Sequence, residues 1–439
     1  MATNIAELSL WGTQIGAVVW HPDLQYGEFQ YSAALQGSGI EPCPITMPVR
    51  NEPYEFRSLN KATFKGLPGM LADMLPDKFG NALIDQWLVR QGRNKSDFNP
   101  VERLCYIGNR GMGALEFAPL LGADKLTDTP INIQQMVKLA SDILTARKIN
   151  IQLNNEKINA EALAQILEIG TSGGGARAKA VIAWNETTKV ICSGNMQPKP
   201  GFSYWLLKFD GVDENSDKEL NDPKGYGRIE YAYYLCAQEA GIEMSECRLL
   251  EEGGRAHFMT QRFDRDTEGR KRHMISLCGM AHYDYQMPGA TSYEQAFQVC
   301  QRLDLPMDDK LQLFRRMVFN VIMRNHDDHT KNISFIMDRT GKWRISPAYD
   351  VTYSYNPIGD WTSKHQMSIN GKQDDFSIDD VLATAKIAGL NSSKCRKIIS
   401  DVQGVANKWE NIAQEVDIEE QRTLKIMETE LSEVVIFSP

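Results

Sequence analysis

The hydrophobic period of this chain changes near residue 265, and no other feature limits its fold as strongly. Before that point, runs with alternating apolar residues are mixed with runs of helical period. Beyond it the period is mainly helical, and one β-hairpin is expected over residues 332–350 with its turn at 339–342. We therefore predict an α+β protein with two lobes, in which a mixed α/β N-terminal lobe precedes a mainly helical C-terminal lobe.

The length of the chain supports its division into more than one packed unit. At 439 residues it exceeds the size, about 250–300 residues, at which single hydrophobic cores stop growing. We expect an N-terminal subdomain over residues 1–125, the remainder of the first lobe over 126–265, and the helical lobe over 266–439. Within the middle unit, a hairpin is expected at 178–194 and a strand at 203–209.

Apolar residues at helical spacing also locate individual helices. One run covers residues 64–91, although Pro76 interrupts it. A second begins near Ile229 and ends at Gly241, and a third covers residues 392–413.

Composition and charge exclude several classes of protein. The net charge is −9 and the sequence pI is about 5.5, whereas proteins that grip nucleic acid usually carry a basic surplus. The N-terminus lacks the basic segment and apolar run of a signal peptide, and no apolar run is long enough to span a bilayer. The eight cysteines are scattered without C-x-x-C spacing, so we expect reduced thiols in a cytoplasmic protein.

The strongest chemical signal lies between Arg324 and Asn332, in the segment RNHDDHTKN. Asp327 and Asn332 have the D-x-x-x-x-N spacing in which kinases place a base and a metal-binding amide. Phosphoryl transfer needs a carboxylate at the attacking hydroxyl and oxygen ligands for Mg²⁺. A polar loop after a helix is the alternative, because this spacing is common by itself. The hairpin that returns Asp350 to this segment favours phosphoryl transfer.

His326 and His329 lie in the same segment, so a zinc site is a second alternative. An H-x-x-H pair can present both rings on one face of a helix. However, no cysteine is nearby, and the helix is expected to end before His326. Hard oxygen ligands suit Mg²⁺ better than Zn²⁺, and we therefore favour magnesium.

A glycine-rich segment from Gly170 to Lys179 lies between an expected helix and an expected strand. Glycines let backbone N–H groups approach phosphate oxygens closely, and Arg177 or Lys179 can add positive charge. The segment is not a Walker A loop, since Ala176 stands where that motif requires lysine. Most glycine runs are flexible surface loops, but the position just before the strands favours a loop that covers a nucleotide.

A lysine on an apolar strand forms the third signal. Lys208 follows the run SYWLL, and Glu230 stands at the start of the next expected helix. Because burying an unpaired ammonium is costly, Lys208 needs an acidic partner, and Glu230 can supply one as in the Lys–Glu pair of kinases. Taken separately, each residue also has an ordinary interpretation. Lys208 can be a lysine on an edge strand whose ammonium reaches solvent, and Glu230 can be a glutamate favoured by the dipole at a helix N-terminus. Their order along the chain, after the glycine loop and before Asp327, favours an ATP site.

Taken together, these motifs resemble the HipA family of bacterial serine/threonine kinases over almost the whole chain. The resemblance rests on segments at 70–80, 107–117, 172–179, 261–265, 326–332 and 346–350. The last four, in this order, are highly specific. A further segment, HMISLCGMAHYDYQMPGATSYE at residues 273–294, is typical of a longer branch of the family rather than of its founding toxin.

The resemblance implies a two-lobed protein-kinase-like fold with ATP and Mg²⁺ between the lobes. It implies Asp327 as the catalytic base, Lys331 near the γ-phosphate, Asn332 and Asp350 as Mg²⁺ ligands, and Lys208 on the ATP phosphates. Further nucleotide contacts are implied for Ser172, Gly173, Gly174, Gly175, Lys179, Glu230, Gln261, Arg262, Phe263 and His329.

Three positions carry additional expectations from the same resemblance. Ser172 matches the loop serine that the family autophosphorylates to inactivate itself, with Thr171 as the neighbouring alternative. Asp328 stands where the toxin has glycine and adds negative charge beside the metal site, and Gln261 replaces an acidic residue. Neither departure removes a catalytic group, so the expected chemistry is unchanged.

The implied function is that of a toxin kinase that phosphorylates a protein, commonly an aminoacyl-tRNA synthetase, and is held in check by a helix-turn-helix antitoxin. Contact with DNA is then indirect, through that partner, and no membrane association is expected. Two alternatives stay open: a small-molecule phosphotransferase of the aminoglycoside-kinase type, and a non-catalytic co-repressor subunit. The first shares only the catalytic loop with this chain, and intact Asp327, Asn332, Asp350 and Lys208 argue against the second.

Overall fold

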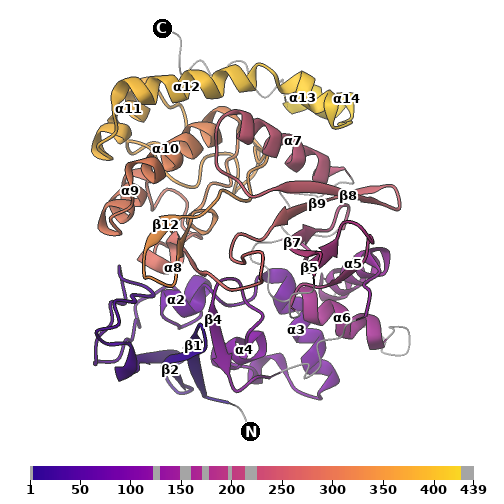
Figure 1. Cartoon of the computed structure of the whole chain (residues 1–439), viewed down its shortest axis with the longest axis vertical. Coiled ribbons are helices and arrows are strands. Elements are labelled where there is room, and N and C mark those ends of the chain that lie inside the picture. Colours follow the sequence, from indigo (N-terminus) through magenta and orange to yellow (C-terminus); the bar gives the residue numbers. More distant parts are fainter. Residues whose placement is uncertain are drawn as a thin grey trace.

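The computed structural model describes residues 3–121, 129–148, 160–170, 177–195, 200–212 and 225–426. In these residues three β-sheets are surrounded by helices, which confirms the predicted α+β class. Figure 1 shows the N-terminal sheet at one end of the molecule, a second sheet at mid-height, and the C-terminal helices at the other end. No helix in the described ranges is long and apolar enough to cross a membrane.

The N-terminal sheet has four antiparallel strands in the order β3-β2-β1-β4. The strands are β1 (Ile5–Leu10), β2 (Thr13–His21), β3 (Tyr26–Tyr31) and β4 (Leu115–Ala118). Along β1 the side chains of Ala6, Leu8 and Leu10 are buried, and the residues between them are more exposed. This alternation is the pattern of a strand with one face on the core.

Helices connect the third and fourth strands of this sheet. Their elements are η1 (Ala33–Leu35), α1 (Lys61–Phe64), α2 (Gly69–Ala72), α3 (Lys78–Arg90), η2 (Lys95–Asp97) and α4 (Pro100–Ile107). The helical run expected at 64–91 is therefore divided, since it breaks before α2 and again around Pro76. Helix α4 was not predicted, although Asn99 and Glu102 form a complete capping box that signals its start.

The second sheet has five antiparallel strands in the order β6-β5-β7-β9-β8. Its strands are β5 (Lys179–Asn185), β6 (Ile191–Ser193), β7 (Phe202–Lys208), β8 (Cys247–Glu252) and β9 (Arg255–Gln261). The predicted hairpin and the predicted third strand are confirmed. The register places Lys179, the first residue of β5, opposite Lys208, the last residue of β7, so two lysines lie side by side at one edge of the sheet.

Helices pack around this sheet from three parts of the sequence. Helices α5 (Ile133–Lys148) and α6 (Ala160–Gly170) share a buried cluster with Phe79 and Leu83 of α3 and with strand residues such as Leu207. Helix α7 (Tyr226–Glu239) contacts β8 and β9. It begins earlier than expected, so Glu230 lies inside its second turn rather than at its start.

The C-terminal part contains a small sheet and most of the remaining helices. Strands β10 (His273–Ser276), β11 (Ser334–Met337) and β12 (Trp343–Ile345) form this sheet, and the last two confirm the predicted hairpin. The helices are α8 (Leu277–Ala281), α9 (Tyr293–Arg302), α10 (Met307–Ile322), η4 (Thr330–Asn332), α11 (Ile378–Ile387), α12 (Ser392–Ala406), α13 (Trp409–Glu415) and α14 (Glu420–Ile426). The run expected at 392–413 is therefore two helices, and β10 was not predicted.

One continuous hydrophobic core joins the two ends of the molecule. It contains Leu8 of the N-terminal sheet, Tyr233 of α7, Phe319 of α10 and Trp409 of α13. The N-terminal sheet therefore does not form a separate core. The hairpin β11–β12 and the end of α10 belong to this core, to which they contribute Phe335, Ile345 and Ile322.

Candidate active site

The end of β7 brings a lysine together with two carboxylates from distant segments. The Nζ atom of Lys208 hydrogen-bonds Glu230 of α7 and lies 2.5 Å from Oδ1 of Asp350, which follows the β11–β12 hairpin. Lys208 and Asp350 are 142 residues apart in the sequence. The predicted Lys208–Glu230 pair and the predicted return of Asp350 are both present in this geometry.

Charges around this lysine fix the ionisation of the group. Burial alone would raise the pKa of Asp350, but the charges of Lys208, Lys179 and Arg177 hold it well below its ordinary value. Burial likewise opposes the charge of Lys208, yet Asp350 and Glu230 raise its pKa above the ordinary value. Both groups are therefore ionised at neutral pH. Asp350 also has a positive φ of 52°, a conformation that the surrounding structure must hold in place.

Arg177 approaches the same cluster from just before β5. Its Nη1 atom lies 3.5 Å from Oε2 of Glu230, and its guanidinium covers the Tyr226 ring at 3.8 Å from the centroid. Glu230 thus contacts two cations, while Asp350 faces several. Three cations, Lys208, Arg177 and Lys179, therefore act on the carboxylates of this cluster.

The predicted base, Asp327, lies in the loop between α10 and η4. Its Oδ1 atom accepts a hydrogen bond of 2.8 Å from Nε1 of Trp361 and lies 3.7 Å from Nε2 of His329. Desolvation raises the pKa of Asp327, although His329 and the Trp361 hydrogen bond partly offset that rise. His329 is therefore beside the predicted base, with its ring between those of Tyr285 and Trp361.

Asn332 is oriented by the same loop. Its Nδ2 atom donates to the backbone carbonyl of Asp327 over 2.8 Å, so its carbonyl oxygen can face another ligand. Asn332 and Asp350 line one small cavity. An amide oxygen and an ionised carboxylate are hard oxygen ligands, and Mg²⁺ commonly takes only one or two protein carboxylates together with substrate phosphates. These two residues therefore fit a Mg²⁺ ion that also binds phosphate.

Two further lysines face carboxylates that the sequence did not single out. Nζ of the buried Lys179 lies 3.5 Å from Oδ2 of Asp77, which also caps the N-terminus of α3. Nζ of Lys331 lies 3.9 Å from Oδ1 of Asp73. Burial raises the pKa of Asp77 to about 6, against the opposing charge of Lys179. Both aspartates lie in MLADMLPDKFG, a motif quoted for the family resemblance but not assigned a role.

Asp328, the neighbour of the predicted base, contacts three other residues in the protein interior. Its side chain is buried and accepts hydrogen bonds from the hydroxyl of Tyr293 (2.9 Å) and the backbone N–H of Gln366 (2.8 Å), while Nδ1 of His365 lies 3.0 Å away. Its negative charge is therefore taken up by a buried network. These partners satisfy the buried carboxylate, which also lines the small cavity shared by Asn332 and Asp350.

Two backbone N–H groups at the strand end Gln261–Phe263 are already paired within the protein. The N–H of Gln261 donates to Glu246 and that of Arg262 to Tyr204, and the Arg262 guanidinium pairs with buried Asp264 at 2.7 Å. The side chain of Arg262 is thus committed to Asp264. Phe263 lies beside Tyr349, with ring centroids 5.9 Å apart. The N–H groups of Gln261 and Arg262 are therefore not free to bind a nucleotide.

The glycine-loop residues and the zinc alternative are the remaining predictions about the site. Ser172, Gly173, Gly174 and Gly175, with Thr171, lie outside the described residues. The zinc alternative is not supported, because His326 is buried against the His365 ring, with centroids 4.1 Å apart. In the described ranges no three His, Cys, Asp or Glu side chains are placed to hold a metal.

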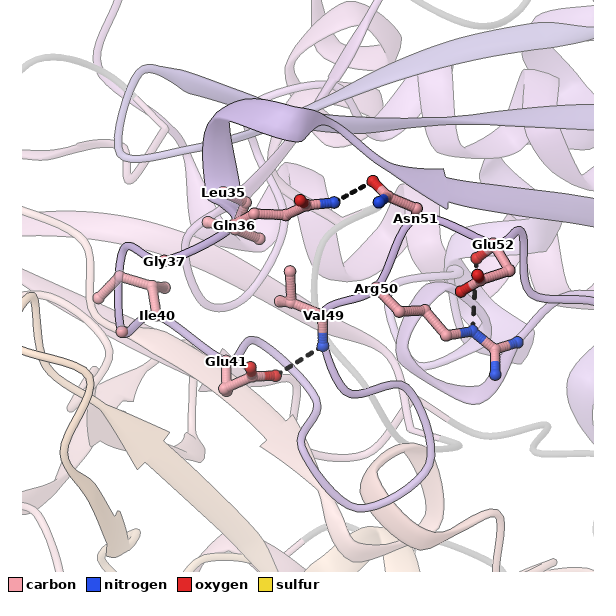
Figure 2. A pocket seen from close by; sticks show the side chains of 10 residues that line it. Leu35, Gln36, Gly37, Ile40, Glu41, Val49, Arg50, Asn51 and Glu52 are labelled. Atoms are coloured by element: carbon pink, nitrogen blue, oxygen red, sulfur yellow. Dashed lines mark hydrogen bonds between the residues drawn. The ribbon is translucent and has the colours of Figure 1, made fainter.

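A separate pocket opens beside the N-terminal sheet (Figure 2). It is lined by residues from Leu35 to Glu41 and from Val49 to Glu52. Its polar groups largely satisfy one another, since Gln36 hydrogen-bonds Asn51 and the N–H of Val49 donates to Glu41 over 2.8 Å. None of the predicted site residues that the structure describes lines this pocket, and we take the cluster around Lys208 as the candidate active site.

Comparison with known proteins identifies the family. Residues 6–118 match the family described as HipA N-terminal domain, and residues 171–409 match the HipA-like C-terminal domain. The chain belongs to the HipA family. The predicted family is thereby confirmed, and both halves of the HipA arrangement are present in one chain.

The individual proteins that this chain matches are distant in sequence. A Haemophilus influenzae protein provisionally named a kinase is 27% identical over 159 residues, which cover 32% of this chain and 46% of that protein, or about half its length. The provisionally named kinase Y4mE of Sinorhizobium fredii is 25% identical over 340 residues, covering 74% of this chain and 71% of that protein.

A solved HipA structure shares the fold of almost the whole chain. It comes from a complex described as the Shewanella oneidensis toxin–antitoxin system HipA, HipB and operator DNA. The alignment has a TM-score of 0.65 and covers 97% of this chain and 95% of that chain, at 18% sequence identity. At this identity the likeness shows the fold alone, and it agrees with the predicted two-lobed kinase-like arrangement.

Proposed function

We propose that this protein is an ATP-dependent serine/threonine kinase of the HipA family. The observation that carries the proposal is the contact of Lys208 with both Glu230 and Asp350. Kinases require such a Lys–Glu pair and a metal-binding Asp to be in place together. The match to a HipA N-terminal domain distinguishes the chain from phosphotransferases of the aminoglycoside-kinase type, which resemble it in the catalytic loop only.

Each residue of the cluster has a distinct role in this proposal. Lys208, held by Glu230, binds ATP phosphates, and Asp327 accepts the proton of the attacking hydroxyl. Asn332 and Asp350 hold Mg²⁺, which neutralises phosphate charge when it is bound. Lys331 lies near the γ-phosphate.

The remaining nucleotide contacts complete the proposal. The loop Ser172–Gly175 covers the phosphates, with Lys179 behind it, and the segment Gln261–Phe263 contacts the adenine. His329 lies beside Asp327 at the phosphate end. Phosphorylation of Ser172 by the protein itself inactivates it, because the added negative charge of about 1.5–2 repels incoming ATP.

The proposal extends to partners and place of action. The matched Shewanella oneidensis protein is described in a complex with HipB and operator DNA. By analogy, we propose that a helix-turn-helix antitoxin binds this chain, that DNA is contacted only through it, and that the chain acts in the cytoplasm. Its substrate is a protein hydroxyl, with an aminoacyl-tRNA synthetase as the first candidate. The three proposed units are 1–125, 126–265 and 266–439.

A phosphorylation assay with a matched variant tests the proposal. Wild-type protein incubated with radiolabelled ATP and Mg²⁺ should phosphorylate itself, and Asp327→Asn should reduce the rate by about a hundredfold or more. ATP with Mg²⁺ should still raise the thermal midpoint of the variant, because Lys208 and Asp350 are unchanged. Equal rates in both proteins would show that Asp327 is not the base. Stabilisation by ATP without any transfer would favour the non-catalytic alternative.

A further inference from the structure

The segment after Asp350 is attached to the catalytic loop at two adjacent carboxylates. Between residues 351 and 377 the chain forms no helix and no strand beyond isolated bridges. Trp361 donates its indole N–H to Asp327, and Gln366 donates its backbone N–H to Asp328. One segment thus contacts the predicted base and its neighbour at the same time.

These two attachments are linked to each other. The side-chain amide of Gln366 hydrogen-bonds the backbone carbonyl of Trp361, and His365 meets Asp328 at 3.0 Å. Asp328 is in turn held by Tyr293, whose hydroxyl also accepts from Asn320 of α10 over 3.0 Å. The position of the Trp361 backbone is therefore fixed through Gln366 and Asp328 by the packed helices.

The contact between Trp361 and Asp327 is of the kind that orients a carboxylate. At 2.8 Å the indole N–H makes a full hydrogen bond to Oδ1. His329 at 3.7 Å is too distant for one, and the Asn332 amide binds the backbone carbonyl of Asp327 rather than its carboxylate. The rotation of the carboxylate is thus set by the segment that follows Asp350.

We propose that Trp361 is a positioning residue, whose indole holds one oxygen of Asp327 so that the other faces the substrate hydroxyl. The inference rests on the proposed kinase function. An indole suits this role chemically, because its N–H is only a donor and cannot take up the proton that the base must accept. A histidine or a carboxylate at the same place could exchange that proton. The ring is also rigid, so little freedom is lost when it is fixed.

Kinetics of one variant and one close analogue test the role. Trp361→Phe keeps an aromatic ring without the donor, and replacement of Trp361 by 3-benzothienylalanine keeps the indole shape with sulfur in place of N–H. Both should lower kcat by about tenfold to a hundredfold, as misplaced catalytic groups do, with little change in KM for ATP. Ile358→Ala is the matched control, since Ile358 is 92% exposed in the same segment and should leave kcat unchanged.

A spectroscopic measurement tests the contact without using activity. In a ¹⁵N–¹H spectrum, the indole resonance absent from Trp361→Phe belongs to Trp361, and it should move in Asp327→Asn, which removes the charged acceptor. An unmoved resonance would overturn the contact. Unchanged kcat in both Trp361 replacements of an active enzyme would overturn the positioning role alone. A wild type that transfers no phosphate would overturn the proposed function, and the inference with it.

Discussion

At the scale of single residues, Lys208 has the most consequential environment. Its ammonium is almost completely buried between Glu230 and Asp350, and Phe258 lies beside it. A buried cation with two anionic partners tolerates loss of charge poorly, because both partners are then left without compensation. Arg177 reaches Glu230 but at a longer distance of 3.5 Å, so it replaces Lys208 only in part.

Lys208→Met should therefore abolish most activity while keeping the apolar stem. We expect kcat/KM for ATP to fall by about a hundredfold to a thousandfold, the usual cost of losing one preorganised charge at a phosphoryl group. The thermal midpoint should also fall. Lys397→Met is the control, because Lys397 is 75% exposed and its pair with Asp401 on α12 contributes about 0.5 kcal/mol or less. A Lys208 variant with wild-type ATP kinetics would contradict the assignment of the phosphate site.

At the scale of elements, the approach of α7 to β9 determines where Glu230 lies. Gly227, in the first turn of α7, faces the backbone of β9 so closely that an added Cβ would lie 2.0 Å from the carbonyl oxygen of Ala256. Backbone cannot yield as a flexible side chain can, so any larger residue forces the helix away from the strand. Glu230 is three residues further along the same helix.

Gly227→Ala should thus affect both stability and ATP binding. We expect a loss of about 1–3 kcal/mol in the free energy of unfolding, as for other overpacked sites, and a higher KM for ATP because Glu230 withdraws from Lys208. Gly404→Ala is the matched control: Gly404 lies inside α12 with nothing within 4 Å of an added Cβ. That substitution should stabilise the protein by about 0.5–1 kcal/mol. Equal stability of both variants in denaturant titration would show that α7 and β9 are not in close contact.

At the scale of the whole molecule, several histidines are buried as neutral groups. Burial lowers the pKa of His257, His273 and His282 to about 4, and it also lowers the pKa of His326 far below its ordinary value. His257 accepts a hydrogen bond from the N–H of Asp210, and His273 pairs with the carbonyl of Pro42. These contacts connect segments far apart in the sequence, so protonating the rings would loosen the long-range packing.

Stability should therefore fall as pH drops from about 6.5 to about 4. In this window the unfolded chain binds protons at these histidines and the folded chain does not, so each contributes a loss of about 1.4 kcal/mol per pH unit. Asp77 acts oppositely, because its raised pKa of about 6 lets the folded chain bind a proton first. Four histidines against one aspartate give a net loss of roughly 4 kcal/mol per pH unit. Denaturant titrations at several pH values measure this slope, and His273→Gln should make it shallower; an unchanged slope would contradict the burial of a neutral ring.

The sequence by itself predicted the α+β class and the HipA family, which are confirmed, and it supplied most residues of the candidate site. Asp327, Asn332 and Asp350 were identified because their spacing and the intervening hairpin are local properties of the chain. Lys208 and Glu230 were identified because a charge on an apolar strand needs a partner. The separate helices at 61–90 were merged into one run, because the proline and glycine breaks between them hardly disturb the helical period. The strand β10 was missed, because four residues are too few to show a clear alternation.

Only the tertiary structure decided which partners the remaining groups have. Asp73 and Asp77 meet Lys331 and Lys179 because α2 and α3 pack against segments more than a hundred residues away. Arg262 is committed to Asp264, Asp328 to a buried network, and Trp361 to Asp327. Sequence patterns report which face of an element is apolar, whereas hydrogen bonds between distant segments depend on how those elements pack. The physical reason is that a buried polar group needs a partner, and which partner it finds depends on the segment that packing places beside it.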